Sequence, residues 1–147
     1  MVVRFVKMDD YNAWLDLAKE VEPIFGKMVD DIDFKNGIRE CIFNSLAFCI
    51  EINNKIQGII AVNSNTNEII WLAVREESRG KRYGHQLVAR ALSFLDNKRP
   101  VFVQTFSPNI KDGEMARKMY LKFGFIDFKD GGKNPAGIDT VIMKLEK

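Results

Sequence analysis

Basic residues and glycines are concentrated in one short stretch, ESRGKRYGHQL, between residues 77 and 87. This stretch contains Arg79, Gly80, Lys81, Arg82, Tyr83, Gly84 and His85. Glycine lets a backbone approach a bulky group closely, and an apolar stripe at helical spacing begins directly after Gly84. Because the free N–H groups of a helix N-terminus attract anions, the stretch predicts a phosphate-binding loop. A turn of this composition also occurs by chance, so an ordinary solvated turn is the alternative.

The spacing of the glycines separates this loop from two common nucleotide-binding motifs. The sequence contains no GxxxxGK[ST] run, and no GxGxxG run with an acidic residue placed for a ribose. Cys41 and Cys49 have neither a CxxC partner nor a histidine at metal-binding spacing. We therefore predict no metal site, and we expect both cysteines to be reduced, buried thiols.

The composition favours one soluble domain. The chain has 147 residues, of which 46% are apolar and 29% are charged, and its formal net charge is +2. This charge is too small to indicate general binding to nucleic acid or to a membrane. No apolar run approaches the ~20 residues that a membrane span needs, and the first residues show no signal peptide. We therefore expect a cytoplasmic protein.

The first third of the chain predicts one strand and two helices. Residues 2–7 alternate like a short strand, and a helix is expected to follow Asp9 or Asp10 as its N-cap and to end at Pro23. Residues 23–31 predict a loop that carries apolar groups. Asp33 is expected to cap a second helix over residues 34–43, although Gly37 within it is unfavourable.

Strands dominate the middle of the chain. Residues 46–52 and 55–62 flank the turn-compatible pair Asn53-Asn54 and predict a hairpin. Residues 68–74 are almost entirely apolar, which is typical of a strand that is buried on both faces. The basic loop then leads into a helix whose apolar stripe is Leu87, Val88, Ala91, Leu92 and Leu95.

The last third predicts three more strands and one helix. Pro100 precedes a strand over residues 101–106, a helix over residues 113–123 ends at Gly124, and strands over 125–128 and 138–145 flank the Gly-rich loop 129–137. The order β-α-α-β-β-β-α-β-α-β-β indicates an α/β or α+β fold built around one mixed sheet. We expect residues 1–147 to form a single domain.

Two motifs carry a resemblance to a known family. Residues 71–92, WLAVREESRGKRYGHQLVARAL, resemble the acetyl-CoA-binding segment of the GNAT (GCN5-related N-acetyltransferase) superfamily: a buried strand, a bulge, then [Q/R]-x-x-G-x-[G/A] opening a helix. Arg79 and Gly84 fit this pattern, whereas Arg82 replaces the middle glycine. Residues 116–125, ARKMYLKFGF, resemble its short helix with a tyrosine before a Gly-Phe strand start. The resemblance implies a mixed, mostly antiparallel sheet of about seven strands flanked by about four helices.

The resemblance implies acetyl-CoA as the cofactor and places it along the chain. Pantetheine would pair with backbone at Leu72, Ala73 and Val74, and the pyrophosphate would lie on the amides of residues 79–85. An amide donor survives at Arg82 if this residue has a helical φ, and its guanidinium could reach a phosphate, or could crowd the cofactor. The asparagine that many members have seven residues before the tyrosine is Gly113 here, and Asn109 is expected to substitute for it.

Acetyl transfer to an amine requires a base for the amine proton and an acid for the leaving thiolate. The resemblance implies Tyr120 as the acid, and an amphipathic tyrosine packed under the cofactor is the alternative. Glu68 is the candidate base, with a solvated carboxylate and a water relay as the alternative. His85 is expected at the surface rather than against phosphate, and the stripe of Met115 and Met119 is expected in the core.

The acceptor is predicted to be a primary amine of a small molecule or a peptide. Phe25, Met28, Trp71 and Phe106 are expected at the acceptor pocket, although core packing is favoured for Trp71. Members of the family are often dimers, so a homodimer is a further possibility. Two other functions remain open: a non-catalytic acyl-CoA-binding or sensory module, and a structural domain with an incidental basic turn.

Overall fold

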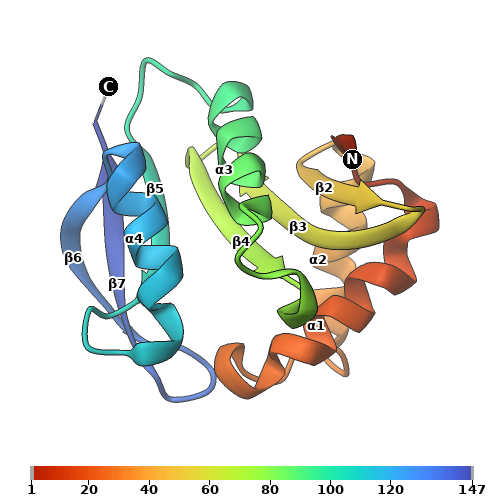
Figure 1. Ribbon diagram of the computed structural model, residues 1–147, viewed down its shortest axis with the longest axis horizontal. Coiled ribbons are helices and arrows are strands. Elements are labelled where there is room, and N and C mark those ends of the chain that lie inside the picture. Colours follow the sequence, from red (N-terminus) through yellow and green to blue (C-terminus); the bar gives the residue numbers. More distant parts are fainter. Residues whose placement is uncertain (1, 147) are drawn as a thin grey trace.

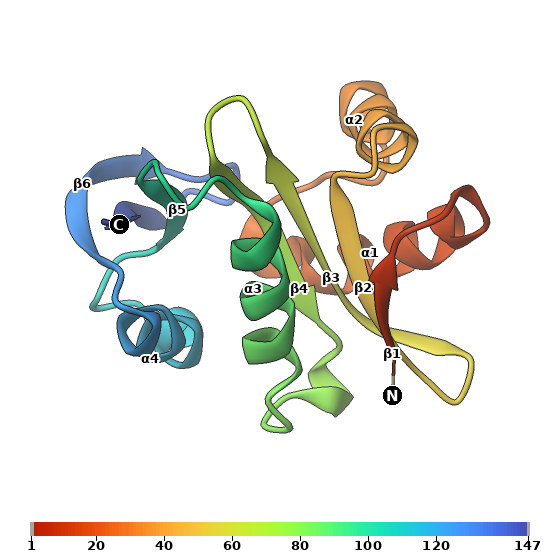
Figure 2. The ribbon, with the colours of Figure 1, turned by 90° about the horizontal axis from the view of Figure 1, so that it is seen from above.

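A computed structural model describes residues 2–146 as one seven-stranded sheet with helices on both faces (Figures 1 and 2). The strands are β1 (Val2–Phe5), β2 (Ala47–Ile52), β3 (Lys55–Asn63), β4 (Glu68–Val74), β5 (Val101–Phe106), β6 (Ile126–Lys133) and β7 (Asp139–Leu145). The helices are α1 (Tyr11–Phe25), α2 (Ile32–Phe43), α3 (Tyr83–Phe94) and α4 (Glu114–Phe123), with short 3-10 turns η1 (Met8–Asp10), η2 (Glu76–Ser78) and η3 (Lys111–Gly113). The predicted element order and fold class are confirmed.

The strand order is β1-β2-β3-β4-β5-β7-β6, and every neighbouring pair is antiparallel except β4 and β5. The β2–β3 hairpin turns at Asn53 and Asn54, whose φ angles are 53° and 62°. Positive φ at both central residues is the two-residue hairpin turn that asparagine tolerates well. The predicted hairpin is therefore confirmed.

Two apolar layers hold the helices to the sheet. Leu87, Val88 and Ala91 of α3 and Tyr120 of α4 belong to the core on one face, whereas α1 and α2 cover the other face (Figure 2). The second core contains Trp14, Leu17 and Val21 of α1, and Ile38 and Ile42 of α2. Burying such aliphatic side chains contributes about 1.5–3 kcal/mol each, which fixes the helices around the strands. None of the helices among residues 2–146 is long and apolar enough to cross a membrane.

The sheet divides between β4 and β5. These strands pair only through Glu68 with Phe102 and Ile69 with Val103, and they then diverge toward the loop before α3 (Figure 1). On the β3 side, Ala61 pairs with Trp71 but Val62 pairs with Ile69, so β4 has one extra residue at Ile70. This β-bulge bends the strand where its pairing with β5 ends.

The bulge corrects the prediction that residues 68–74 are buried on both faces. Ile70 is 49% exposed, because β5 stops pairing with β4 beside it. From this point β4 and β5 diverge and form a fork. The bulge also changes which face the side chains take: Ile69 packs in the α3 core, whereas Trp71, two residues later, packs with α1. In a regular strand these two residues would share one face.

Both ends of α1 differ in detail from the prediction. The helix continues past Pro23 to Phe25 and ends at Gly26, whose φ is 104°. A proline this close to the C-terminus removes one helical hydrogen bond only, so the last turn still forms. At the other end, Asp10 does precede the helix, but its carboxylate accepts hydrogen bonds from Arg4 and from the Lys7 N–H.

The N-cap of α2 is Asp31, and the prediction of Asp33 is wrong. The Asp31 carboxylate accepts the N–H of Asp33 at 2.9 Å, and the helix begins between them at Ile32. An N-cap side chain bonds to the amide two or three positions ahead, so the cap must precede Ile32. Asp33 lies in the first turn, where its charge suits the helix dipole.

The Gly-rich segment after α4 is largely strand. Residues 129–133 continue β6 to Lys133, and only residues 134–138 form the turn to β7. The register shifts at two places in β6, which accommodates the extra residues. Gly131 is required there, because a Cβ would lie 2.5 Å from the Thr140 hydroxyl oxygen.

Candidate functional site

The basic loop stands free of the core between η2 and α3. Residues 79–82 are exposed, and no atom lies within 4 Å of the place where a Cβ on Gly80 would be. Gly80 has a φ of 81°, which glycine adopts without strain. Residues 79–82, the crown of the loop, are thus solvated, and the course of their backbone depends on the residues at the two ends of the loop.

Arg82 adopts the left-handed conformation, with φ 67° and ψ 19°, at the N-cap of α3. The condition stated for its amide donor, a helical φ, is thus met only in the left-handed region. The backbone must turn here from the loop into the helix, and a left-handed residue makes that turn. Glycine adopts this conformation freely, whereas any other L-residue costs about 1–2 kcal/mol. Glycine, which the motif has at this position, would avoid that cost.

The first amides of α3 form a donor surface beside this crown. The first helical hydrogen bond runs from the Gln86 N–H to the Arg82 carbonyl. The N–H groups of Tyr83, Gly84 and His85 precede it, and the first amides of a helix have no acceptor within the helix. With the exposed cations Arg79, Lys81 and Arg82 around them, these amides can hold an anion such as a pyrophosphate.

Gly84 faces the space between α3, α4 and β4. A Cβ at Gly84 would lie 3.6 Å from the Met119 sulfur and 3.9 Å from a Val74 methyl group. A methyl group alone would make ordinary contacts, but a longer side chain would fill this space. A side chain longer than that of alanine at Gly84 would therefore press on Met119 and Val74.

The second half of β4 presents a free edge to the fork. The N–H of Arg75 donates to Gln57 on β3, at 2.8 Å. Because N–H groups alternate along a strand, Val74 and Leu72 direct their backbone groups away from β3 and toward the fork. The Arg79 side chain donates to the Val74 carbonyl at 3.3 Å, which agrees with this direction. The structure thus brings the predicted residues Leu72 and Val74 to an edge that an extended ligand can join, while Ala73 faces β3.

Tyr120 lies under the fork on the α4 side. It is 3% exposed and belongs to the apolar cluster that also contains Leu72 and Val74. Its ring packs edge-on against Phe125, with 5.4 Å between centroids. Burial raises the pKa of the phenol above its usual value, which already lies above neutral pH.

Glu68 lies at the closed end of the fork. It is half-buried and pairs with Asn63 on β3 and with Phe102 on β5. Since the next residue, Ile69, faces the α3 core, Glu68 is on the opposite face, which α1 covers. The structure therefore places the two candidate proton carriers, Tyr120 and Glu68, on opposite faces of the sheet.

An aromatic bridge crosses the fork on the α1 face. The ring of Phe25, the last residue of α1, lies 6.1 Å from Trp71 on β4 and 6.1 Å from Phe106 on β5. Met28 packs against the same cluster. Three of the predicted acceptor residues are thus in contact, and Trp14 of α1 extends the bridge at 5.7 Å from Trp71.

The segment after α1 is held against the β6–β7 turn. Gly26 lies so close to Pro135 that a Cβ on the glycine would be 2.5 Å from the proline Cβ. The Asn134 side chain donates to the Ile24 carbonyl at 2.9 Å. The Glu22 carboxylate accepts the N–H groups of Met28 and Val29, which lowers its pKa. These contacts cover the end of the aromatic bridge.

Gly113 is fixed by its contact with Phe106. A Cβ at Gly113 would lie 2.5 Å from the Phe106 Cβ and 2.7 Å from its ring. No side chain therefore fits at Gly113 while Phe106 keeps its place. Asn109 is exposed in the turn after β5, and nothing in the structure tests its predicted role.

Three side-chain predictions need correction. Met115 is 67% exposed because it lies on the outer face of α4, while Met119 does pack against the core. His85 is half-buried and stacks on Phe123 of α4, at 4.6 Å between ring centroids, so it joins the two helices. Cys49 is buried, but Cys41 on α2 is only partly so. Burial raises the pKa of the Cys49 thiol to about 11.

Two polar residues of the site region have no counterpart in the sequence predictions. Gln57 and Ser78 are 8% and 5% exposed, and the Ser78 hydroxyl donates to the Gln57 side-chain oxygen. The signal in the sequence was one glutamine within the otherwise apolar run IQGIIAV. Among residues 2–146 there is no group of three or more His, Cys, Asp or Glu that could hold a metal ion.

Residues 19–147 match a family model described as an acetyltransferase (GNAT) domain. No curated protein matches the sequence.

Several solved structures share the fold over nearly their whole length. A GNAT-family acetyltransferase from Bacillus cereus has a TM-score of 0.77 at 19% identity, covering 99% of this chain and 96% of that one. A ribosomal-protein-alanine N-acetyltransferase from Brucella melitensis has a TM-score of 0.79 at 14% identity, with both chains fully covered. The PaiA N-acetyltransferase from Thermoplasma acidophilum, solved with coenzyme A, has a TM-score of 0.74 at 16% identity, covering 99% and 98%.

Proposed function

Because the chain belongs to the GNAT acetyltransferase family, we propose that it is an acetyl-CoA-dependent N-acetyltransferase. The acetyl group is moved to a primary amine of a small molecule or a peptide, by direct attack in a ternary complex. The observation that carries this proposal is the fork between β4 and β5. The edge of β4 is free along the fork, and the N-terminus of α3, with its unpaired N–H groups, lies at the open end. A structural domain with an incidental basic turn would not be expected to have both a free strand edge and a helix N-terminus at the same fork.

The described residues fit coenzyme A in shape and in hydrogen bonding. The backbone groups of Leu72 and Val74 that point into the fork suit the amides of pantetheine, because an extended chain can pair with a strand edge. The Val74 carbonyl also accepts the Arg79 side chain at 3.3 Å. The α3 amides and the exposed cations suit a pyrophosphate. The relative from T. acidophilum was solved with coenzyme A, which supports the same cofactor here. When bound, acetyl-CoA supplies the activated thioester.

Tyr120 is the proposed proton donor for the leaving thiolate. Its phenol carries its proton at neutral pH, as an ordinary tyrosine does, and it packs in the apolar cluster that reaches the fork. An acid must hold its proton until the thiolate forms, and a buried phenol meets this requirement. Recharging of the phenol requires a path to solvent after each turnover.

Glu68 is the proposed base, directly or through a water. It lies on the α1 face, as do Trp71, Phe25 and Phe106, so an amine that reaches the fork from that face arrives on the side of the carboxylate. Aromatic faces also attract an ammonium group before it loses its proton. Phe25, Met28, Trp71 and Phe106 are thus proposed to receive the acceptor.

The test is a panel of amine acceptors incubated with acetyl-CoA, in which release of free thiol is measured. At least one primary amine should give thiol release well above the hydrolysis seen without acceptor. A thermal-shift titration with acetyl-CoA accompanies the panel, because a ligand that binds only the folded state raises the apparent stability. No shift at saturating acetyl-CoA would refute the proposed cofactor, and with it the proposed function.

A non-catalytic acyl-CoA-binding module is the alternative that this panel leaves, if binding occurs without turnover. Tyr120→Phe decides between the two. In the enzyme, removal of the acid should lower kcat about 10²-fold or more while coenzyme A affinity stays near normal. Glu68→Gln should lower kcat with a changed pH profile. A cytoplasmic location and a homodimer stay predictions from the composition and the family.

A further inference from the structure

Apart from Arg79, whose side chain donates to the Val74 carbonyl, the residues that fix the basic loop in place lie outside the loop itself. The crown, residues 79–82, is exposed, and Gly80 has nothing within 4 Å of its missing Cβ. The far end of the loop is anchored through α3, whose Leu87 and Val88 are fully buried. The near end has no comparable apolar anchor, since Glu76 and Glu77 of η2 are exposed.

Gln57 holds both ends of η2. Its backbone carbonyl accepts the N–H of Arg75 at 2.8 Å, and its side-chain oxygen accepts the hydroxyl of Ser78. The Arg75 side chain adds a bond to the Ile56 carbonyl at 2.8 Å. Ser78 directly precedes Arg79, so its position determines where the crown begins.

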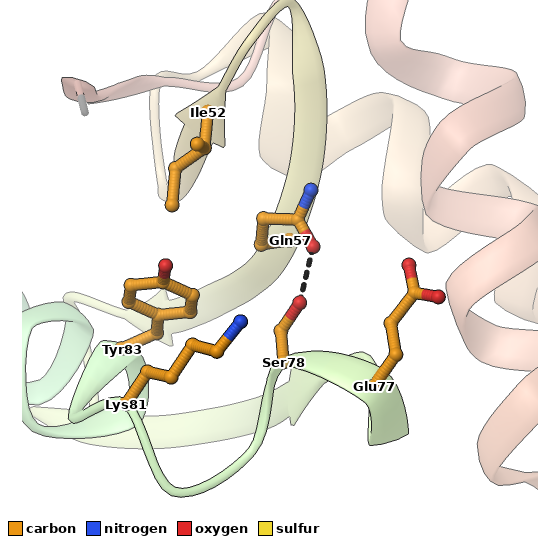
Figure 3. A pocket seen from close by; sticks show the side chains of 6 residues that line it. All are labelled: Ile52, Gln57, Glu77, Ser78, Lys81 and Tyr83. Atoms are coloured by element: carbon orange, nitrogen blue, oxygen red, sulfur yellow. Dashed lines mark hydrogen bonds between the residues drawn. The ribbon is translucent and has the colours of Figure 1, made fainter.

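A β-bulge places Gln57 for this contact. Ile50 pairs with Gly58 but Glu51 pairs with Ile56, so Gln57 is an extra residue on β3. A bulge redirects a side chain that regular pairing would send elsewhere. Figure 3 shows that the Gln57 side chain reaches across to Ser78. Both residues line a cavity of about 340 Å³, together with Ile52, Glu77, Lys81 and Tyr83.

The cavity makes the position of the loop depend more strongly on the Gln57–Ser78 hydrogen bond. It separates the loop from the end of the β2–β3 hairpin, so the loop has little apolar packing on this side. A hydrogen bond between two buried side chains is directional, and an unpaired partner is costly. The Gln57–Ser78 pair can therefore set the direction in which the backbone enters the crown.

We propose that Gln57 and Ser78 are positioning residues that hold the loop 79–84 in the geometry that binds the cofactor pyrophosphate. The inference rests on the proposed function, because it takes coenzyme A to be the ligand of the loop. Neither side chain touches the reacting atoms in this account. Loss of the pair therefore weakens cofactor binding and leaves the chemical step alone.

The experiment compares Ser78→Ala, Gln57→Met and the double variant with the wild type. Coenzyme A binding is measured by calorimetry, and the order parameters of the amides of residues 79–84 are measured by NMR in the ligand-free protein. Each single variant should weaken binding about tenfold, because one partner of a buried hydrogen bond is lost. The order parameters should fall from about 0.85 toward 0.6. The double variant should bind coenzyme A as tightly as the single variant with the lower affinity, since both substitutions remove the same Gln57–Ser78 hydrogen bond.

Two controls separate positioning from general stability. Ser78→Thr keeps the hydroxyl and should restore affinity to within about twofold of the wild type. Thr140→Val removes a buried hydroxyl that bonds Gln104 and the Gly132 carbonyl, on strands away from the loop. Thr140→Val should lower the melting temperature yet leave coenzyme A affinity and the loop order parameters unchanged.

Three outcomes are decisive. Ser78→Ala with lower stability but wild-type affinity and loop order would overturn the inference, and so would additive losses in the double variant. A wild type that does not bind coenzyme A would refute the proposed function. The order parameters would still show in that case whether the pair holds the loop.

Discussion

Replacement of Arg82 by glycine tests the explanation of the left-handed residue at the start of α3. Arg82 has a φ of 67°. Relief of this conformation should stabilise the folded state by about 1–2 kcal/mol. Glycine also gives the unfolded chain more freedom, which costs about 0.4–1 kcal/mol. The net expected change is a gain of about 0–1.6 kcal/mol with a midpoint of about 0.8 kcal/mol, and that midpoint corresponds to roughly 2–3 °C in melting temperature for a chain of this size.

Lys81→Gly is the matched control. Lys81 is also exposed and lies one residue earlier in the loop, but its φ is not positive. It gains no conformational relief, so only the entropy loss of about 0.4–1 kcal/mol remains. Thermal or urea unfolding of both variants therefore measures the left-handed strain as their difference, about 1–2 kcal/mol. Equal destabilisation by the two changes would refute the argument.

Arg82→Gly also tests the role of the guanidinium in cofactor binding. Loss of one exposed cation near the phosphates should weaken coenzyme A binding about two- to fivefold at low salt. The remaining affinity should depend less on ionic strength, because one screened attraction is gone. Tighter binding would show instead that the arginine crowds the cofactor.

Three further predictions concern Gly113, Cys49 and the N-cap of α2. Gly113→Ala should lower the unfolding free energy by about 1–3 kcal/mol through its clash with Phe106, and Phe106→Ala should lessen that loss; an unchanged urea midpoint would contradict the contact. The folded Cys49 thiol has a pKa of about 11 against an ordinary value of 9.0, so its contribution is complete below pH 9 and is lost as pH rises toward 11. Cys49→Ala should remove part of the alkaline fall in stability, and an identical pH profile would show that the thiol contributes nothing. Asp31→Ala should cost about 0.5–2 kcal/mol by loss of the α2 cap, and Asp33→Ala clearly less; the reverse order of melting temperatures would restore Asp33 as the cap.

The sequence predicted the elements well because their signals are local. The hairpin follows from Asn53-Asn54 between two apolar runs, and the end of α4 follows from Gly124, whose φ is 105°. The free edge of β4 was also predictable in outline, since Leu72 and Val74 were named from the resemblance alone. The hairpin and the end of α4 depend on neighbours within a few residues, whereas the edge of β4 is free because the distant strand β5 stops pairing with it.

The errors concern features that depend on distant partners or on backbone angles. The exposure of Ile70 depends on where β5 stops pairing with β4, and only the sheet shows this. The strand at residues 129–133 forms because β7 supplies a partner for a Gly-rich segment. The φ of Arg82 and the buried pair of Gln57 with Ser78 have no local signature, because arginine rarely adopts that φ and the two polar residues are 21 positions apart.

The most direct test of the central claim is the exchange of individual β4 amides, measured by NMR with and without saturating coenzyme A. The claim is that the cofactor lies along the free edge of β4 within the fork. The amides of Leu72 and Val74 should exchange at least about tenfold more slowly in the complex, because they gain hydrogen-bond acceptors. Ala73, whose amide faces β3, should change little and serves as the internal control. Saturated binding without protection at Leu72 and Val74 would contradict the account.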